Sequence, residues 1–255
     1  MSKFDVIVPA RFGSTRFPGK PLHQLAGKTM LEHVVNRAHA SGAGAVHVAT
    51  DDERIRQAMA AIGQSVLMTS PEHPSGTDRL EEAARLLALD PETIVVNVQG
   101  DEPLIPPAVI TQAATLLDSS AADVASLYEP FTARHEVLNP NAVKVVLDLR
   151  GRALYFSRAP IPFVRDHAVI ADDAAFARLE PGTFRRHVGI YAYRVRALTR
   201  VVELDPSPLE TLERLEQLRL LSSGLAIQMA AACEPIPAGV DTPEDAQRVA
   251  ALLNG

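Results

Sequence analysis

The sequence is poor in cysteine and has no long apolar run. Cys233 is the one cysteine among the 255 residues, so the chain can form neither an intrachain disulfide nor a cysteine cluster for zinc. The longest apolar runs, such as 58–62 and 229–233, are five residues long, whereas a membrane-spanning helix needs about 20. The sequence begins without an extended apolar signal segment. We therefore expect no membrane-spanning helix and a cytoplasmic location.

A basic excess is missing as well. The formal net charge is -6, which argues against a partner bound through nucleic-acid phosphates. The chain is 47% hydrophobic and 22% charged, as is typical of globular proteins, so disordered and collagenous classes are excluded. At about 150 residues per domain, the length allows one large domain or a domain with a smaller appendage. Because we find no repeat, low-complexity tract or linker, we predict a single domain over residues 1–255.

Short apolar segments alternate with amphipathic segments in the first half of the chain. Strands are predicted at 4–8, 45–50, 65–68 and 93–98, and helices at 30–40, 53–62, 77–89 and 107–117. This alternation predicts an α/β fold with a doubly wound, mostly parallel sheet covered on both faces. Strands predicted at 123–127, 142–147, 153–156 and 188–194 are not separated by regular helices, which indicates a small antiparallel excursion.

Two later helices have clear start signals. Ser207, Pro208 and Glu210 supply a serine cap, a first-turn proline and a capping-box glutamate. We expect that helix to run to about Leu221. A Thr-Pro pair at 242–243 opens the last helix in a similar way.

The densest chemical signal is the loop 9–22 after the first strand. It holds two glycines, two hydroxyl residues, two arginines and a lysine, which can offer backbone N–H groups and positive charge to a polyphosphate. The alternative, that glycine and proline only turn the chain and the cations are solvated, stays open. Two common phosphate motifs are excluded, because Leu22 and His47 stand where the Walker A and dinucleotide motifs need glycine.

Two aspartates are candidates for a metal. Asp101 follows a buried strand in the stretch Gln-Gly-Asp-Glu-Pro, at the end that faces the ligand crevice in open α/β sheets. A carboxylate there could hold Mg²⁺, although a turn aspartate explains it as well. Asp241 lies just before the last helix, where a negative charge favours the helix dipole in any protein.

A third group of residues could recognise a second substrate. Strand alternation places His187 and Tyr191 on one face of a strand, although a structural histidine is an equal alternative. Glu216 interrupts an apolar helix stripe with Leu209 and Leu212, so it needs a polar partner or a ligand. Arg158 follows an aromatic strand and could grip a carboxylate, or it could form a surface ion pair.

Seven stretches together resemble the CMP-Kdo synthetases, the family of 3-deoxy-manno-octulosonate (Kdo) cytidylyltransferases. They are 8–22, 97–103, 139–146, 155–158, 187–193, 208–219 and 240–245, so the resemblance covers nearly the whole chain. The stretch 165–183 is divergent. The resemblance implies a nucleotidyltransferase fold, a homodimer, and conversion of CTP and Kdo to CMP-Kdo and pyrophosphate for lipopolysaccharide assembly.

The resemblance also implies roles for individual residues. Arg11 and Lys20 would hold the CTP phosphates, and Asp101 and Asp241 would ligate Mg²⁺; these four residues would be catalytic. The nucleotide-binding set would be Ala10, Arg11, Gly13, Ser14, Lys20, Ser75, Gly76 and Gln99. The set around Kdo would be Gln99, Arg158, His187, Tyr191, Glu216 and Gln217.

The reaction expected from these residues is attack by the anomeric hydroxyl of Kdo on the α-phosphorus of CTP. Phosphoryl chemistry needs positioning and charge neutralisation more than covalent catalysis. A Mg²⁺ ion held by Asp101 and Asp241 would lower the pKa of the acceptor hydroxyl, so no protein general base is required. A sialic-acid or other sugar cytidylyltransferase is the nearest alternative. A non-catalytic nucleotide-binding regulator is disfavoured, because it would need neither a second metal acid nor an acceptor pocket. A purely structural α/β protein would not respond to CTP.

Overall fold

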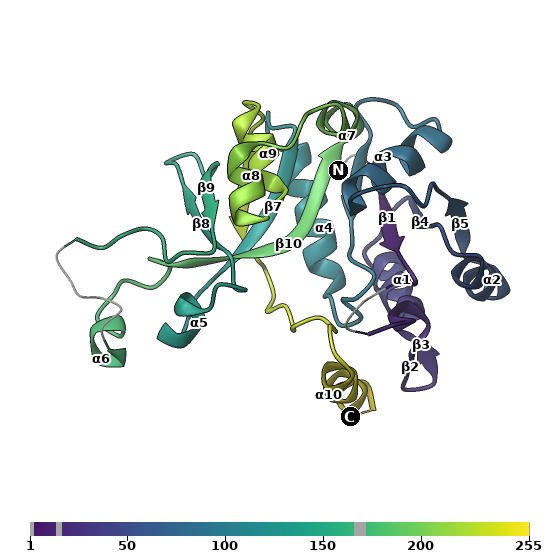
Figure 1. The fold of residues 1–255 in the computed structure, drawn as a ribbon, viewed down its shortest axis with the longest axis horizontal. Helices are drawn as coiled ribbons and strands as arrows, with labels where there is room; N and C mark the ends of the chain where they lie inside the picture. The colour runs from purple at the N-terminus through teal and green to yellow at the C-terminus, as the bar shows by residue number, and fades with distance from the viewer. Residues whose placement is uncertain (1–2, 14–16, 166–171, 255) are drawn as a thin grey trace.

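The computed structural model describes residues 3–13, 17–165 and 172–254, which form one α/β unit with a projecting segment that carries β8, β9, α5 and α6 (Figure 1). The strands are β1 (Phe4–Ala10), β2 (Gln24–Leu25), β3 (Lys28–Thr29), β4 (Ala45–Thr50), β5 (Ser65–Met68), β6 (Ile94–Asn97), β7 (Val124–Pro130), β8 (Lys144–Leu147), β9 (Ala153–Ser157), β10 (Arg185–Arg194) and β11 (Ile227–Ala231). The helices are η1 (Lys20–Leu22), α1 (Met30–Ala40), α2 (Glu53–Ala61), α3 (Gly76–Leu86), α4 (Pro107–Asp118), α5 (Arg134–Leu138), α6 (Asp173–Phe176), α7 (Val195–Val202), α8 (Pro208–Glu213), α9 (Gln217–Ser222) and α10 (Pro243–Asn254).

The main sheet of the described residues has nine strands, in the order β11-β7-β10-β6-β1-β4-β5 with β8 and β9 attached through β10. Strands β6, β1, β4 and β5 are parallel. Strand β10 runs antiparallel to β6 and β7, and β8 runs antiparallel to β9 and β10. The predicted doubly wound, mostly parallel sheet with an antiparallel excursion is therefore confirmed.

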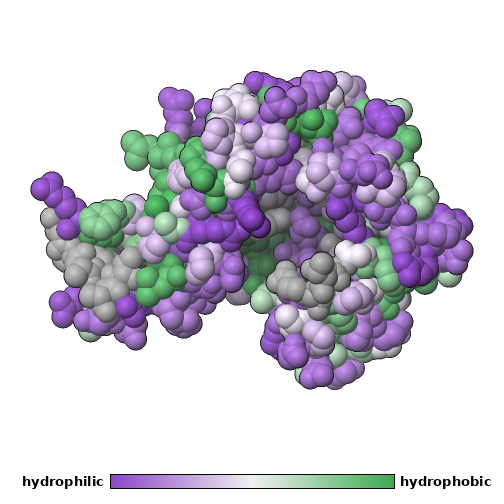
Figure 2. Space-filling view, in the orientation of Figure 1, coloured by the Kyte–Doolittle hydropathy of each residue, from purple (hydrophilic) through white to green (hydrophobic). Residues whose placement is uncertain are grey.

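The surface seen in Figure 2 is mostly hydrophilic, and hydrophobic side chains gather over the β8–β9 hairpin. Two leucines of that hairpin, Leu149 and Leu154, are exposed. Among the described residues, no helix is both long enough and apolar enough to cross a bilayer.

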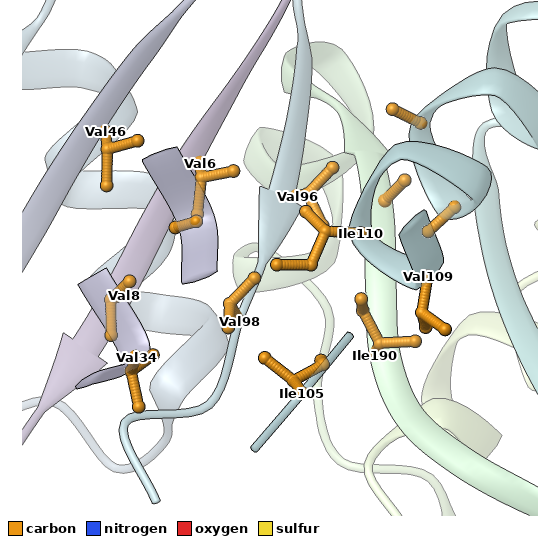
Figure 3. Close-up of a cluster of buried hydrophobic side chains, with 14 of the residues drawn as sticks. Val6, Val8, Val34, Val46, Val96, Val98, Ile105, Val109, Ile110 and Ile190 are labelled. Carbon is orange, nitrogen blue, oxygen red and sulfur yellow. The ribbon is translucent and has the colours of Figure 1, made fainter. Parts of the chain in front are cut away.

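Both faces of the sheet are covered, because side chains alternate along its buried strands. On β1, Val6 and Val8 join the apolar cluster formed with α1, α2 and α4 (Figure 3), whereas Ile7 joins the cluster formed with α3, α7 and α9. All three side chains are fully buried, and each contributes about 1.5–3 kcal/mol through the hydrophobic effect. This packing holds the carboxyl ends of β1 and β6 side by side.

The helix predicted from Ser207 to about Leu221 is wrong in its length. The capping box of Ser207 and Glu210 is present, but the helix ends at Glu213 and a new helix, α9, begins at Gln217. Arg214 lies between them with a left-handed φ of 52°.

The break in this helix also removes the predicted apolar stripe. Leu209 and Leu212 are exposed, so they do not form one buried face with Glu216. The carboxylate of Glu216 instead reaches the Ser75 hydroxyl. Our reason for selecting Glu216 was therefore wrong, although the residue does meet a polar partner.

Candidate active site

A cavity of about 410 Å³ opens where the carboxyl ends of β1 and β6 meet, the edge at which open α/β sheets bind ligands. We call it the loop cavity. It is lined by Pro9, Ala10, Arg11, Gly13, Lys20, Pro21, Gln99, Gly100, Asp101 and Asp241. Seven of the predicted site residues are in this lining. Ser14, which we also predicted, lies outside the described residues.

The two loops of this cavity touch at Gly100. A Cβ atom added there would lie 3.0 Å from the carbonyl oxygen of Pro9, which is closer than most Cβ atoms approach their neighbours. Glycine at this position therefore lets the loop after β6 lie directly against the end of β1.

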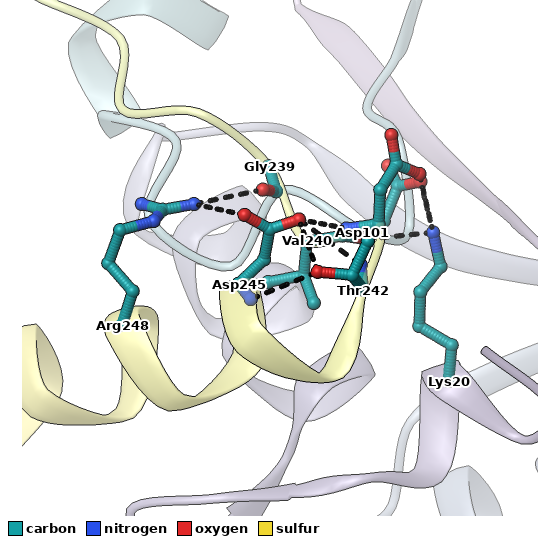
Figure 4. Close-up of polar contacts among 8 residues, drawn as sticks. Lys20, Asp101, Gly239, Val240, Thr242, Asp245 and Arg248 are labelled. Carbon is teal, nitrogen blue, oxygen red and sulfur yellow. Dashed lines mark hydrogen bonds and ion pairs between the residues drawn. The ribbon is translucent and has the colours of Figure 1, made fainter. Parts of the chain in front are cut away.

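Two carboxylates that are far apart in the sequence converge on one ammonium group (Figure 4). Lys20 Nζ lies 2.7 Å from Asp101 Oδ2 and 3.5 Å from Asp241 Oδ1. It also donates to the carbonyl of Val240 at 2.9 Å. The sequence predicted that the two aspartates share one site, and the structure brings them together around a cation that belongs to the protein.

Backbone contacts explain why Asp241 lies beside Asp101. The N–H of Val240 donates to the carbonyl of Asp101 at 2.9 Å. A Cβ atom at Gly239 would be 3.0 Å from that same carbonyl oxygen, so the segment before Asp241 passes very close to the loop after β6. These contacts hold the segment before Asp241 against the loop that carries Asp101.

The start of α10 is capped without the Asp241 carboxylate. Asp245 Oδ2 accepts from the N–H groups of Asp241 and Thr242, each at 3.1 Å. The Thr242 hydroxyl in turn accepts from Asp245 N–H at 3.3 Å. The Asp241 carboxylate faces Lys20, so its placement is not explained by helix capping alone.

Glu102, the residue after Asp101, has a buried Oε2 atom with no hydrogen-bond partner in the described structure. Burial is the main cause, and the charge of Asp101 a smaller one, of a pKa raised to about 7 for this carboxyl; the charge of Arg186 opposes the shift. The Glu102 carboxyl therefore titrates near neutral pH and is not a full negative charge beside Asp101.

Arg11 connects the first loop to the start of α3. Its guanidinium donates to the carbonyl of His73 and, at 3.3 Å, to the carbonyl of Ser75. The Ser75 hydroxyl caps α3 by accepting from the N–H groups of Thr77 and Asp78. It also donates to Glu216 Oε1 at 2.8 Å, so the predicted residues Arg11, Ser75 and Glu216 form one connected group.

A second cavity, of about 70 Å³, lies on the other side of Gln99. We call it the tyrosine cavity. Its lining is Thr77, Asn97, Gln99, Tyr191, Tyr193, Val201, Glu216, Gln217 and Leu220. Gln99 lines both cavities, so a molecule in one would be next to a molecule in the other. Gln99, Tyr191, Glu216 and Gln217, which were predicted as acceptor residues, are brought together here.

His187 and Tyr191 lie on the same face of β10 although a β-bulge separates them. His187 pairs with Tyr128 and Val188 with Leu127, but the next paired residue, Tyr191, lies opposite Ser126. The bulge therefore inserts two residues, and an even insertion preserves the alternation of side chains. The rings of His187 and Tyr191 are 5.3 Å apart, as the alternation predicted.

His187 is neutral at physiological pH. Burial lowers the pKa of its imidazole to about 3, and the neighbouring charge of Arg186 contributes. Its Nε2 lies 3.2 Å from the Ser126 hydroxyl. The residue can therefore form hydrogen bonds but cannot supply a positive charge to an acidic substrate.

Glu216 and Tyr191 are also perturbed by burial. Loss of water raises the pKa of the Glu216 carboxyl, and the hydrogen bond from Ser75 opposes this shift. Burial likewise raises the pKa of the Tyr191 phenol, which is therefore a neutral hydroxyl. Perturbed groups gathered in a cavity are typical of functional sites.

Arg158 does not reach either cavity in this structure. Its guanidinium donates to the carbonyls of Glu213 at 2.6 Å, Pro140 at 3.0 Å and Arg214 at 3.4 Å. The backbone N–H of Arg158 donates to the Glu213 carboxylate at 2.9 Å, which also accepts from the Ser157 hydroxyl at 2.7 Å. Arg158 thus stabilises the break between α8 and α9, a contact that its sequence position did not indicate.

A cavity of about 520 Å³ lies away from these residues, on the projecting segment. Its lining includes the aromatic rings of Phe131, Phe176 and Phe184. It is not at the carboxyl ends of the parallel strands, where ligands of this fold bind. The loop and tyrosine cavities are therefore the better candidate site despite their smaller volumes.

Sequence reasoning missed Asn97, Thr77 and Tyr193 as members of the tyrosine cavity. A signal for Asn97 was available, because it is the one polar residue of β6 and lies two positions before Gln99. Residues two apart on a strand share a face. Thr77 had no comparable signal, since the position of α3 against α7, β1 and β4 is a tertiary feature.

The fold and this arrangement of a glycine-containing loop, a lysine and two carboxylates are those expected of a nucleotidyltransferase. Residues 6–227 match the family model described as Cytidylyltransferase. A solved cytidylyltransferase from Leptospira borgpetersenii shares the fold, with a TM-score of 0.62 at 18% identity, over 100% of this chain and 87% of that one.

More similar relatives define the family more narrowly. Two curated proteins, from Cellvibrio japonicus (54% identical) and Saccharophagus degradans (52% identical), are both 3-deoxy-manno-octulosonate cytidylyltransferases; in each case 98% of both chains is covered. A solved CMP:2-keto-3-deoxy-manno-octonic acid synthetase complexed with CTP has a TM-score of 0.88 and 41% identity, over 99% of each chain. This chain therefore belongs to the 3-deoxy-manno-octulosonate cytidylyltransferase family, as its motifs predicted.

Proposed function

We propose that this protein transfers the cytidylyl group of CTP to Kdo and releases pyrophosphate. The observation that carries the proposal is the meeting of Lys20, Asp101 and Asp241 in the loop cavity, which shares Gln99 with a second, polar cavity. Two adjoining cavities suit a reaction between two bound substrates, one anionic nucleotide and one hydroxylated acceptor.

The loop cavity suits the nucleotide. Arg11 and Lys20 bring positive charge to its wall, and the N–H groups of the first loop can face phosphate oxygens. Charge neutralisation and positioning are the main protein contributions to phosphoryl transfer. Arg11 would hold the triphosphate and fix the loop that carries Ser75 and Gly76, and Lys20 would stabilise the leaving pyrophosphate.

Asp101 and Asp241 fit a Mg²⁺ ion by the chemistry of their donor atoms. Both are carboxylates, and both already approach a single cation, the ammonium of Lys20. Within residues 3–13, 17–165 and 172–254 no group of three or more His, Cys, Asp or Glu side chains could hold a metal. Mg²⁺ commonly takes one or two carboxylates and completes its shell with water and substrate phosphate. When bound, it would supply charge stabilisation at the α-phosphate.

The tyrosine cavity suits part of the acceptor, since its polar lining comes from Thr77, Gln99, Tyr191, Glu216 and Gln217. In the reaction, the anomeric oxygen of Kdo forms a bond to the α-phosphorus, the bond from that phosphorus to the bridging oxygen of pyrophosphate breaks, and the hydroxyl proton leaves to water. His187, as a neutral imidazole, would donate or accept a hydrogen bond at the acceptor.

Pyrophosphate release is the direct test. The purified chain is mixed with CTP and Mg²⁺ in three parallel reactions: with Kdo, with neuraminate, and without an acceptor. We expect release with Kdo alone. Release with neuraminate but not with Kdo would favour a sialic-acid cytidylyltransferase, and no release in any reaction would contradict a transferase of this class.

Four statements from the sequence stay predictions: a cytoplasmic location, a homodimer, a single domain over 1–255, and supply of activated Kdo for lipopolysaccharide assembly. The absence of a nucleic-acid partner, expected from the net charge of -6, also stays a prediction.

A further inference from the structure

Two buried polar atoms of the tyrosine cavity have no hydrogen-bond partner in the described structure. They are Oδ1 of Asn97 and the hydroxyl of Tyr191. Asn97 is 4% exposed and Tyr191 is 8% exposed. Buried polar atoms are nearly always paired in folded proteins, so an unpaired atom requires an explanation. Two of them in the lining of one cavity indicate a missing polar group between them.

The sheet places these two residues together. Asn97 and Tyr191 are direct partners in the antiparallel pairing of β6 and β10, and directly paired residues project from the same face with Cβ atoms about 4.5–5.5 Å apart. Gln99 lies two residues after Asn97, at the boundary with the loop cavity. Asn97 lines only the tyrosine cavity, so it lies farther than Gln99 from the loop cavity.

Three neighbouring polar side chains, Thr77, Tyr193 and Glu216, have partners within the protein. Thr77 forms side-chain hydrogen bonds with Tyr193 and Glu216, and Glu216 also accepts from Ser75 at 2.8 Å. These groups need no ligand to complete their bonding. Asn97 and Tyr191 are different, because nothing in the described part of the protein completes theirs.

The size of the cavity limits what can enter. At about 70 Å³ the tyrosine cavity is much smaller than the loop cavity of about 410 Å³. It suits the end of a hydroxylated carbon chain better than a complete eight-carbon sugar acid. A hydroxyl group is the natural partner for both atoms, because it can donate to the amide oxygen of Asn97 and accept from the Tyr191 hydroxyl.

We propose that Asn97 is a specificity-determining residue that recognises a hydroxyl group on the side chain of the acceptor sugar. This inference rests on the proposed function, since it assigns one part of the acceptor to the tyrosine cavity. Asn97 Oδ1 accepts a hydrogen bond from that hydroxyl, and Tyr191 completes the pair. An acceptor without the hydroxyl leaves both buried atoms unpaired and is rejected, whereas a purely apolar pocket would discriminate weakly.

The test compares acceptors that differ by one hydroxyl. We would measure kcat/KM for Kdo and for Kdo analogues that each lack one side-chain hydroxyl, in the parent protein and in Asn97→Leu, which is similar in size but has no polar side-chain atom. We expect the parent to prefer Kdo over at least one analogue by about 100-fold or more. In Asn97→Leu that preference should fall to less than about 10-fold, with the KM for CTP unchanged.

Gln64→Leu is the matched control. Gln64 is another buried amide, but its Nε2 donates to the Val46 carbonyl at 2.6 Å and its Oε1 lies 2.9 Å from His39 Nε2, far along the sheet from the cavity. This variant should melt at a lower temperature and keep the parental preference for Kdo. If Asn97→Leu does not fold, Asn97→Ala and Tyr191→Phe remove the same polar atoms with less change of shape.

The outcomes separate this inference from the proposed function. No pyrophosphate release from the parent with Kdo would overturn the proposed function. Release with Kdo, together with no preference over any analogue, would overturn the role of Asn97 alone. A parental preference retained in the Asn97 variants, with only a lower melting temperature, would show that Asn97 has a structural role.

Discussion

Replacing Asp241 by asparagine separates the stability of the fold from the chemistry of the site. The Asp241 side chain is 51% exposed and lies 3.5 Å from Lys20 Nζ, so this ion pair contributes about 1 kcal/mol or less to stability. The substitution also leaves the cap of α10 in place, since Thr242 and Asp245 supply it. For a protein of this size, about 1 kcal/mol shifts the melting temperature by roughly 2–4 °C. We expect Asp241→Asn to shift it by no more than that.

The expected effect on catalysis is much larger. Removing one group that stabilises a transition state commonly costs about 10²–10³ in turnover, and we expect a loss of that size in pyrophosphate release. The assay is a magnesium titration at saturating CTP and Kdo, with thermal melting of the same samples. Turnover close to that of the parent at every magnesium concentration would refute the role of Asp241 as a metal ligand.

Asp148→Asn is the control for this experiment. It makes the same chemical change in the β8–β9 turn, where Asp148 Oδ1 accepts from the N–H groups of Arg150 and Arg152, each at 2.8 Å. We expect this variant to melt at a lower temperature and to keep parental turnover. Both variants lose one carboxylate charge, but only Asp241→Asn loses a group of the candidate site. A loss of turnover in that variant alone would therefore be due to the site.

Three further predictions follow from the same contacts. In Lys20→Ala, Asp101 and Asp241 lose their shared cation, so turnover at saturating CTP should fall strongly, and Mg²⁺ should raise the melting temperature more than it does in the parent; equal magnesium shifts would contradict this. The imidazole of His187 stays neutral in the folded protein down to a pH of about 3, because its pKa is lowered to about 3, whereas in the unfolded chain it takes up a proton below about 6.5. The parent should therefore lose stability relative to His187→Gln as the pH falls from 6.5 to 3, and melting-temperature differences that are the same at pH 7.5 and pH 4.5 would refute the argument. Arg214 has a left-handed φ of 52°, which costs a residue with a Cβ atom about 1 kcal/mol or more, so Arg214→Gly should melt at or above the parental temperature and Arg214→Val below it; the reverse order would be the contrary result.

Local signals predicted the first half of the fold well. The helix at 30–40 and the strands at 45–50 and 65–68 have the predicted bounds, because hydrophobic periodicity and local caps determine them. The predicted helix to Leu221 was wrong because Arg158 bonds to the carbonyls of Glu213 and Arg214 and stabilises a break. That contact joins residues more than 50 positions apart, and no local pattern shows it.

In the candidate site, too, some features could be predicted from local sequence and others depend on tertiary contacts. The loop after β1 and the stretch around Asp101 could be predicted because both follow buried strands. The approach of Asp241 to Asp101 depends on tertiary contacts, namely the backbone hydrogen bond between Val240 and Asp101 and the contacts of Lys20 with both segments, which sequence spacing does not reveal. The pairing of Asp101 with Asp241 was predicted from the chemistry of the reaction and from family motifs. The spacing of the two residues in the sequence could not have predicted it.

The hydrogen bond from Val240 to Asp101 also links catalytic competence to the order in which the chain folds. All the residues that line the loop cavity, apart from Asp241, lie before position 102. A nascent chain could therefore form that part of the cavity early. The second carboxylate arrives only when the segment after Gly239 docks and α10 packs on Leu25 and Met30 through Val249. A growing chain would thus carry a nucleotide-binding loop with a single acid until α10 is in place.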